Sequence, residues 1–263
     1  MGEFNPTGID DYKPAEMARL VEELGVRKAV MPALQLFTLA VLAGAFIGFG
    51  ALAFTMVMTG ADLSFGPARL LGGITFSLGL ILVIVGGAEL FTGNALLVMA
   101  LVDRRIGIGA LLRNWAIVYA GNFTGALGLV ALVALAHLMD GPLGETARKI
   151  AAAKASLPLD VAFFRGVLCN ALVCLAVWLT IAARSVTGKI LAIVWPISAF
   201  VLLGLEHSVA NMYLVPAGWW AGADVTASAV LATLAAVTVG NVVGGAGGVG
   251  LAYWLVYRPA RTP

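Results

Sequence analysis

Two glutamates and a histidine stand inside long apolar stretches of this sequence. Glu89 is the one acid between residues 70 and 102, and Glu206, followed directly by His207, is the one acid between residues 190 and 223. A carboxylate in the middle of a bilayer costs about 2.5–3.5 kcal/mol even on lenient insertion scales. These side chains must therefore face protein or water, and they mark an interior polar site.

The chemistry available at this site depends on His207. Imidazole generally titrates near pH 6.5, so it can hold or release a proton beside the anion of a weak acid. The alternative is a neutral core histidine satisfied by one hydrogen bond. The other histidine, His137, lies near Asp140 at the end of an apolar stretch and is expected to be interfacial.

Poor helix formers follow each glutamate: Thr92, Gly93 and Asn94 after Glu89, and Ser208 and Asn211 after Glu206. We therefore expect both apolar stretches to be interrupted near the membrane midplane, with positive helix ends turned inward. The glutamates are expected to hydrogen-bond the unwound backbone and support these breaks; the alternative is a direct role in transport. Asn122 and Asn241 either join helices or line the route as donors.

The composition requires that membrane helices position these residues. Of 263 residues, 61% are hydrophobic and 11% charged, whereas soluble domains have about 25% charged residues. A soluble domain is excluded, and a net charge of +2 gives no argument for nucleic acid. A spanning helix needs about 20 apolar residues, which predicts an all-α membrane domain over residues 29–257. Its six expected spans are 29–61, 70–102, 114–139, 166–183, 190–223 and 225–257.

The ends of the chain are expected to lie outside this domain. Residues 1–28 form an amphipathic amino-terminal segment, in which Met17, Leu20, Val21 and Leu24 fall on one face of a helix ending near Gly25. This helix is either an interfacial anchor or a gate. Residues 258–263 form a short tail. Eleven basic residues on the side of the termini against five on the other predict that both termini are cytoplasmic.

Two motifs occur twice. The pattern G-x-E-x-x-x-x-N begins at Gly87 and again at Gly204, an offset of 117 residues, and G-N-x-x-G begins at Gly121 and again at Gly240, an offset of 119. The two offsets describe one repeat of three helices. Because three spans are odd in number, the second copy must enter the membrane from the opposite side, which gives an inverted repeat.

Motifs for enzymatic chemistry are missing from the sequence. It contains no P-loop, no Cys/His set with zinc spacing and no nucleophile–base arrangement, and the glycine-rich run at 244–248 lies in an apolar stretch with no preceding strand. We therefore expect no enzyme, no cofactor and no metal site.

Four ordered motifs resemble the formate/nitrite transporter family: residues 76–80 (FSLGL), 87–94 (GAELFTGN), 165–170 (RGVLCN) and 206–212 (EHSVANM). The resemblance extends from about Tyr12 to Tyr257. It implies an aquaporin-like protomer of six helices, with the second and fifth broken, assembled as a homopentamer in the bacterial inner membrane.

The resemblance also implies roles for individual residues. Thr92 and His207 correspond to a central polar pair in the pore, with Asn170 and Asn241 nearby, and Lys154 corresponds to a basic residue that adds positive potential. Glu89 and Glu206 support the helix breaks. The apolar constrictions correspond to Phe76, Leu80, Leu90, Phe91 and Phe200.

The sequence is thus interpreted as a channel or transporter for small monovalent anions of weak acids, formate first, with pH dependence through His207. Nitrite or hydrosulfide is the nearest alternative. A different class, a neutral-solute facilitator of aquaporin type, lacks its paired Asn-Pro-Ala signature here. A non-transporting scaffold would leave the buried glutamates and the histidine unexplained.

Overall fold

A computed structural model describes residues 11–60 and 62–257. The predicted tail at 258–263 and the first ten residues of the amino-terminal segment lie outside the described residues. Within the described part of the chain every regular element is helical. In order they are α1 (Pro14–Ala29), α2 (Ala33–Met58), α3 (Phe65–Gly86), η1 (Gly93–Leu97), α4 (Val98–Val102), α5 (Ile108–Leu135), α6 (Pro142–Ala155), α7 (Leu159–Ala182), α8 (Val186–Leu202), α9 (Ser208–Trp220), α10 (Ala227–Val242), η2 (Val243–Leu251) and α11 (Ala252–Tyr257).

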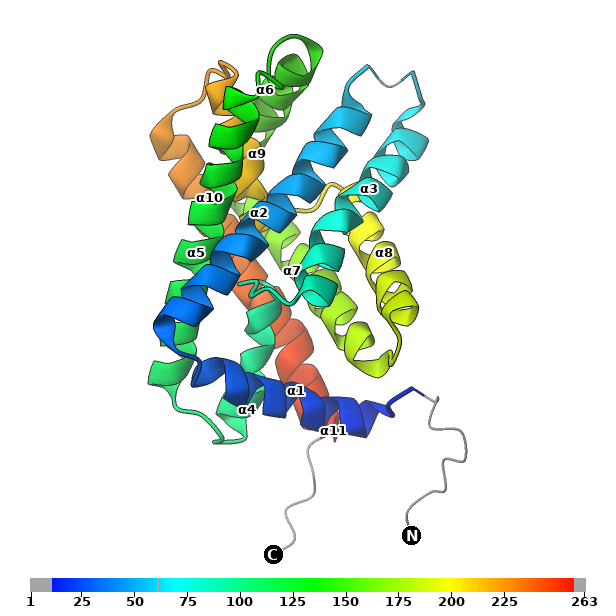
Figure 1. Ribbon diagram of the computed structural model, residues 1–263, viewed down its shortest axis with the longest axis vertical. Helices are drawn as coiled ribbons and strands as arrows, with labels where there is room; N and C mark the ends of the chain where they lie inside the picture. Colours follow the sequence, from blue (N-terminus) through cyan, green and yellow to red (C-terminus); the bar gives the residue numbers. More distant parts are fainter. Residues whose placement is uncertain (1–10, 61, 258–263) are drawn as a thin grey trace, which may run out of the picture.

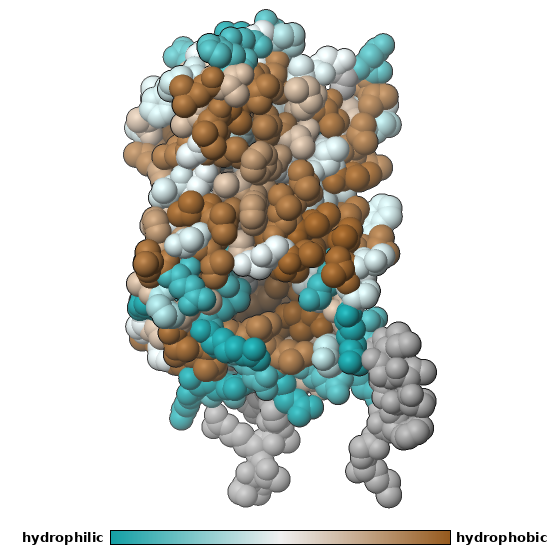
Figure 2. Space-filling view, in the orientation of Figure 1, coloured by the Kyte–Doolittle hydropathy of each residue, from teal (hydrophilic) through white to brown (hydrophobic). Residues whose placement is uncertain are grey.

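Within residues 11–60 and 62–257, five helical stretches are long and apolar enough to cross a membrane: α2, α3, α5, α7 and the continuous run Ala227–Tyr257. The runs Gly93–Val102 and Val186–Leu202 are apolar but shorter. Figure 2 shows the surface that results, a broad hydrophobic band with hydrophilic residues gathered at both ends of the molecule. This distribution is that of a membrane protein.

The two short helices α1 and α6 lie at opposite ends of the bundle (Figure 1). α1 continues to Ala29, so the expectation that it ends near Gly25 is wrong. Gly25 is buried inside the helix, and a Cβ there would lie 3.1 Å from the Cβ of Ala100. This glycine therefore serves close packing on α4 instead of ending the helix.

Glycines let the long helices approach in pairs. Gly125 of α5 lies against the carbonyl of Val41 in α2, and Gly244 of η2, which continues from α10, lies against the carbonyl of Val167 in α7. A side chain at either glycine would collide with backbone that cannot move aside. The same packing thus occurs twice, at the repeat spacing seen in the sequence.

The two stretches with a glutamate are interrupted. The helix α3 ends at Gly86, and the chain resumes helical structure at Gly93; α8 ends at Leu202, and α9 begins at Ser208. Gly87 and Gly204 turn the chain in left-handed conformations, with φ of +81° and +68°, which glycine adopts without a steric penalty. The two interrupted segments carry the residues expected to do chemistry.

Candidate functional site

Two asparagines hold the unwound backbone. Asn122 of α5 donates from Nδ2 to the carbonyls of Ala40 (2.8 Å) and Glu89 (2.9 Å), and its Oδ1 accepts from the N–H of Phe91 (2.9 Å). The side chain is fully buried. One amide therefore satisfies two backbone groups of the interrupted segment, the carbonyl of Glu89 and the N–H of Phe91, and joins that segment to α2 through the carbonyl of Ala40.

Asn241 of α10 makes the same three bonds in the second half. Its Nδ2 donates to the carbonyls of Gly166 (2.8 Å) and Glu206 (3.0 Å), and its Oδ1 accepts from the N–H of Ser208 (2.8 Å). Asn241 was expected either to join helices or to line the route as a hydrogen-bond donor. In the structure its Nδ2 donates to two backbone carbonyls.

Each buried glutamate forms a three-residue cluster with a lysine and an asparagine. Lys28 Nζ lies 3.1 Å from Glu89 Oε1 and donates to Asn94 Oδ1 at 2.9 Å, while Asn94 Nδ2 donates to Glu89 Oε2 at 2.9 Å. Lys28 comes from α1, and Asn94 lies in η1. The lysine charge and the hydrogen bonds together compensate a carboxylate that is only 6% exposed.

The second cluster repeats this chemistry at the other end. Lys154 Nζ of α6 donates to both carboxylate oxygens of Glu206, at 3.0 and 2.9 Å, and Asn211 Nδ2 donates to Glu206 Oε2 at 2.8 Å. The expectation that the glutamate carboxylates bond the unwound backbone is therefore wrong. The asparagines of α5 and α10 take that role, because an amide offers both a donor and an acceptor, whereas a carboxylate only accepts.

Thr92 and His207 meet between the two interrupted segments. His207 caps α9: its Nδ1 accepts from the N–H of Ala210 at 3.0 Å, and its Nε2 lies 3.0 Å from Thr92 Oγ1. Because Nδ1 is an acceptor, the neutral ring carries its hydrogen on Nε2 and donates it to Thr92. Asn170 donates to the carbonyls of Thr92 (3.2 Å) and Asn241 (2.6 Å). The four residues predicted as the central polar group are thus contiguous.

An aromatic pair lies next to this centre. The rings of Phe76 and Phe200 meet edge to face with centroids 5.4 Å apart, and Phe200 stacks on the His207 imidazole at 5.9 Å. Leu80, Leu90 and Phe91 are buried in the same core. Phe91 packs edge to face on Tyr119, at 4.9 Å between centroids.

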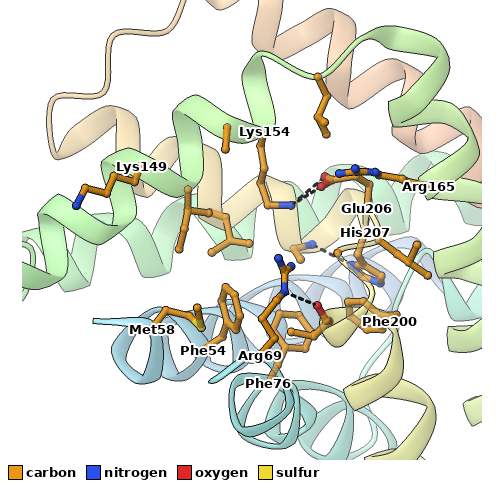
Figure 3. Close-up of a pocket in the computed structure, with 18 of the residues that line it drawn as sticks. Phe54, Met58, Arg69, Phe76, Lys149, Lys154, Arg165, Phe200, Glu206 and His207 are labelled. Carbon is orange, nitrogen blue, oxygen red and sulfur yellow. Dashed lines mark hydrogen bonds and ion pairs between the residues drawn. The ribbon is translucent and has the colours of Figure 1, made fainter. Parts of the chain in front are cut away.

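A cavity of about 420 Å³ opens beside α6 and reaches His207. Phe76 and Phe200 are among its lining residues, and Lys154 and Glu206 lie on its wall (Figure 3). The lining of this cavity thus combines cationic side chains, the aromatic pair and His207. We call this opening the α6 mouth, and the opposite end, where Lys28 lies, the α1 mouth.

Two features of the site were not predicted. Lys28 reads as a lysine flanking a span, and the helix at Pro142–Ala155 was not expected. Lys154 was predicted through the family resemblance, although by its position alone it reads as a loop lysine. The signal that could have found them is spacing: Lys28 and Lys154 are 126 residues apart, as are Leu39 and Arg165, whose carbonyls accept from the N–H groups of Glu89 and Glu206. Lys28 therefore lies as many residues before Leu39 as Lys154 lies before Arg165.

Apolar helices interrupted inside the bundle, with buried ion pairs and free polar groups at the interruptions, define a membrane transport protein. The family model described as "Formate/nitrite transporter" matches residues 15–255. The chain belongs to the formate/nitrite transporter family.

Similar proteins agree with this membership. The chain is 39% identical over 272 residues to the formate channel FocA of Escherichia coli (strain K12), with 95% of both chains covered. It superimposes on a structure titled "FNT family ion channel" with a TM-score of 0.86 at 31% identity, covering 94% of this chain and 99% of that one. For "Pentameric formate channel with formate bound" the TM-score is 0.80 at 39% identity, covering 86% and 98%. These relatives are channels and not enzymes.

Proposed function

We propose that this protein is a homopentameric channel or transporter for small monovalent anions of weak acids, formate first, in the bacterial inner membrane. Each protomer crosses the membrane six times in two inverted three-helix halves, with its own pore and both termini cytoplasmic. Membership in the family, the similarity to a pentameric formate channel and the duplicated contacts of the two halves support this proposal.

The observation that carries the proposal is the position of His207. It lines the cavity together with Phe76 and Phe200, stacks on Phe200, and holds its Nε2 hydrogen toward Thr92. An anion that displaces the threonine hydroxyl gains this donor in a site with no bulk water. The apolar constriction, to which Leu80, Leu90 and Phe91 contribute, excludes ions that cannot shed hydration.

Lys154 raises the local concentration of anions in the α6 mouth. Because both oxygens of Glu206 already accept from its ammonium group, the pair attracts an anion without holding it as tightly as a free lysine would. Lys28 and Glu89 act in the same way in the α1 mouth. Both glutamates also keep the interrupted segments in place, since Asn94 and Asn211 bond to them.

Transport depends on pH through His207, which gives a proton to the anion or pairs with it when charged. A proton on Nδ1 competes with the N–H of Ala210, so charging the ring releases the cap of α9. Proton uptake and the local structure of the interrupted segment are therefore coupled in this proposal.

The test is a side-by-side flux assay in proteoliposomes with formate, nitrite, hydrosulfide and glycerol. We expect formate to pass fastest and glycerol not to pass. Faster nitrite or hydrosulfide would replace formate as the substrate but keep the mechanism, whereas glycerol swelling without anion flux would indicate a neutral-solute facilitator. No flux of any solute through assembled protein would contradict transport.

The orientation is tested by impermeant thiol labelling of whole cells. The native cysteines are buried, so Ile108→Cys at the start of α5 and Glu145→Cys in α6 report the two ends separately. We expect Glu145→Cys to react from outside and Ile108→Cys to be shielded. The reverse pattern would place the α1 mouth outside.

A further inference from the structure

The cavity of the α6 mouth carries more positive charge than its one carboxylate balances. Arg69, Lys149, Lys154 and Arg165 line it, and Glu206 is the one acid among its lining residues. Lys154 already bonds both oxygens of Glu206. The remaining three cationic side chains leave the cavity strongly positive.

Two of these cations are guanidinium groups without an acidic partner. Arg69 donates from Nε to the carbonyl of Val201 at 3.3 Å and lies over the ring of Phe65, with its Cζ 5.3 Å from the centroid. These contacts fix the side-chain stem, and within the described part of the chain neither terminal amino group of Arg69 has a hydrogen-bond acceptor. Among residues 11–60 and 62–257, no carboxylate lies within 4 Å of a nitrogen of Arg69 or Arg165.

Figure 3 places the two arginines in the same cavity: Arg69 extends from α3 below it and Arg165 from α7 on one side, with Lys154 above. Gly204, in the interrupted segment, lies against the Arg69 guanidinium; a Cβ there would be 3.2 Å from its Nη2. The absence of a side chain at this glycine therefore lets the guanidinium lie close to the segment that carries His207.

The helix scaffold does not require these arginines. At the offset of 117 residues, Val186 is equivalent to Arg69. At the offset of 126 residues, which also relates the two lysines, Leu39 is equivalent to Arg165. The backbone carbonyls of Leu39 and Arg165 make equivalent hydrogen bonds, to the N–H groups of Glu89 and Glu206. The α1 mouth thus builds the same backbone with apolar side chains, and the two guanidiniums are specific to the α6 mouth.

We propose that Arg69 and Arg165 form a capture site for a compact, doubly charged oxyanion in the α6 mouth, and that the bound dianion obstructs the pore from that side. Two guanidinium forks match the oxygens of a tetrahedral dianion. Dehydrating a dianion costs far more than dehydrating formate because the cost rises with the square of the charge. The dianion therefore stays in front of Phe76 and Phe200 instead of passing.

Binding is tested independently of transport, by calorimetric titration of the assembled, detergent-solubilised protein with sodium sulfate at constant ionic strength. We expect saturable binding that is at least about tenfold weaker in the double variant Arg69→Gln/Arg165→Gln. Arg148→Gln removes a neighbouring charge of α6 that does not line the cavity, and should bind as the wild type does. Equal binding in the double variant, no binding to the wild type, or equal weakening by Arg148→Gln would overturn the capture site.

Obstruction is tested by sidedness, and this part rests on the proposed function. Formate flux is followed with sulfate on one side only, each variant being compared with its own rate without sulfate. We expect inhibition of the wild type from the α6 side alone, lost in Arg69→Gln/Arg165→Gln and reduced in Arg69→Lys, which keeps the charge but loses the fork. Equal inhibition from both sides would contradict the obstruction. If no anion is transported, the titration still decides whether the site binds sulfate.

Discussion

Asn122 in the first half of the chain and Asn241 in the second each hold an interrupted segment through three hydrogen bonds to equivalent backbone groups. Lys28 and Lys154 each pair with a buried glutamate, and an asparagine five residues after each glutamate completes the cluster. A helix interrupted in a membrane needs these groups wherever it occurs, because its unpaired backbone cannot reach water.

The halves differ at the positions that the proposed function places along the permeation route. His207 is equivalent to Leu90 in the first half, and Thr92 is equivalent to Val209 in the second. Phe200 is equivalent to Val83 in the same way. The comparison separates two kinds of residue: the duplicated asparagines and ion pairs hold the interrupted segments, whereas the proposed chemistry of the pore rests on residues present once.

The largest effect is expected from removing a duplicated support. Asn241→Ala leaves two buried backbone groups of the interrupted segment, the carbonyl of Glu206 and the N–H of Ser208, without their partner, and each costs about 1–3 kcal/mol. We expect the variant to lose its detergent-stable assembly, measured by size-exclusion chromatography and thermal unfolding, and Asn122→Ala to do the same. Thr238→Val, on the same helix, removes a hydroxyl that bonds Tyr119 and the carbonyl of Leu234, and should remain assembled. If only one of the two variants lost its detergent-stable assembly, the two asparagines would not be equivalent.

The sequence predicted much of this scaffold because its signals are local. Apolar length located the long helices, and the poor helix formers after the two glutamates located the interruptions. Partners from distant segments could not be predicted in this way: Lys28 and Glu89 are 61 residues apart, and nothing local to either residue indicates the other. α6 was missed because a surface helix with little apolar character reads as a loop between spans.

The second-largest effect is expected at His207, which has no equivalent histidine in the first half. His207→Asn keeps a donor near Thr92 but cannot titrate, so we expect assembled protein whose formate flux loses its pH dependence between about pH 5 and 8, where the wild type changes by about tenfold. Thr92→Val keeps the imidazole and should keep a pH-dependent flux at a lower rate. Flux in proteoliposomes across this range compares the three proteins. A wild-type pH profile in His207→Asn would make the histidine a structural residue.

A smaller effect is expected at the aromatic pair. Phe200→Ala removes the ring that packs on Phe76 and His207, so anion leak should rise by about threefold to tenfold, because a wider apolar passage admits water. Val83→Ala, at the equivalent position of the first half, should change the leak little. Conductance is compared only for protein that remains assembled. Equal leak in both variants, or disassembly of Phe200→Ala without any change in flux, would assign Phe200 to packing.

The smallest effect distinguishes α1 from α6. α1 buries Glu22, whose pKa is raised by burial and by Asp103, an effect that Arg105 partly opposes from 3.5 Å. The buried residues of α6 include no carboxylate. A raised pKa means that docked α1 binds the proton more tightly than undocked α1. Docking therefore strengthens as the pH falls toward the ordinary range of glutamate and weakens as the pH rises through the raised value.

We expect amide exchange of α1, corrected for intrinsic rates, to increase by about twofold from pH 5 to 7.5, with α6 unchanged. Glu22→Gln should remove this trend. Glu23→Gln, on the exposed side of the same helix, should keep it. A persistent trend in Glu22→Gln would show that another group controls the docking of α1.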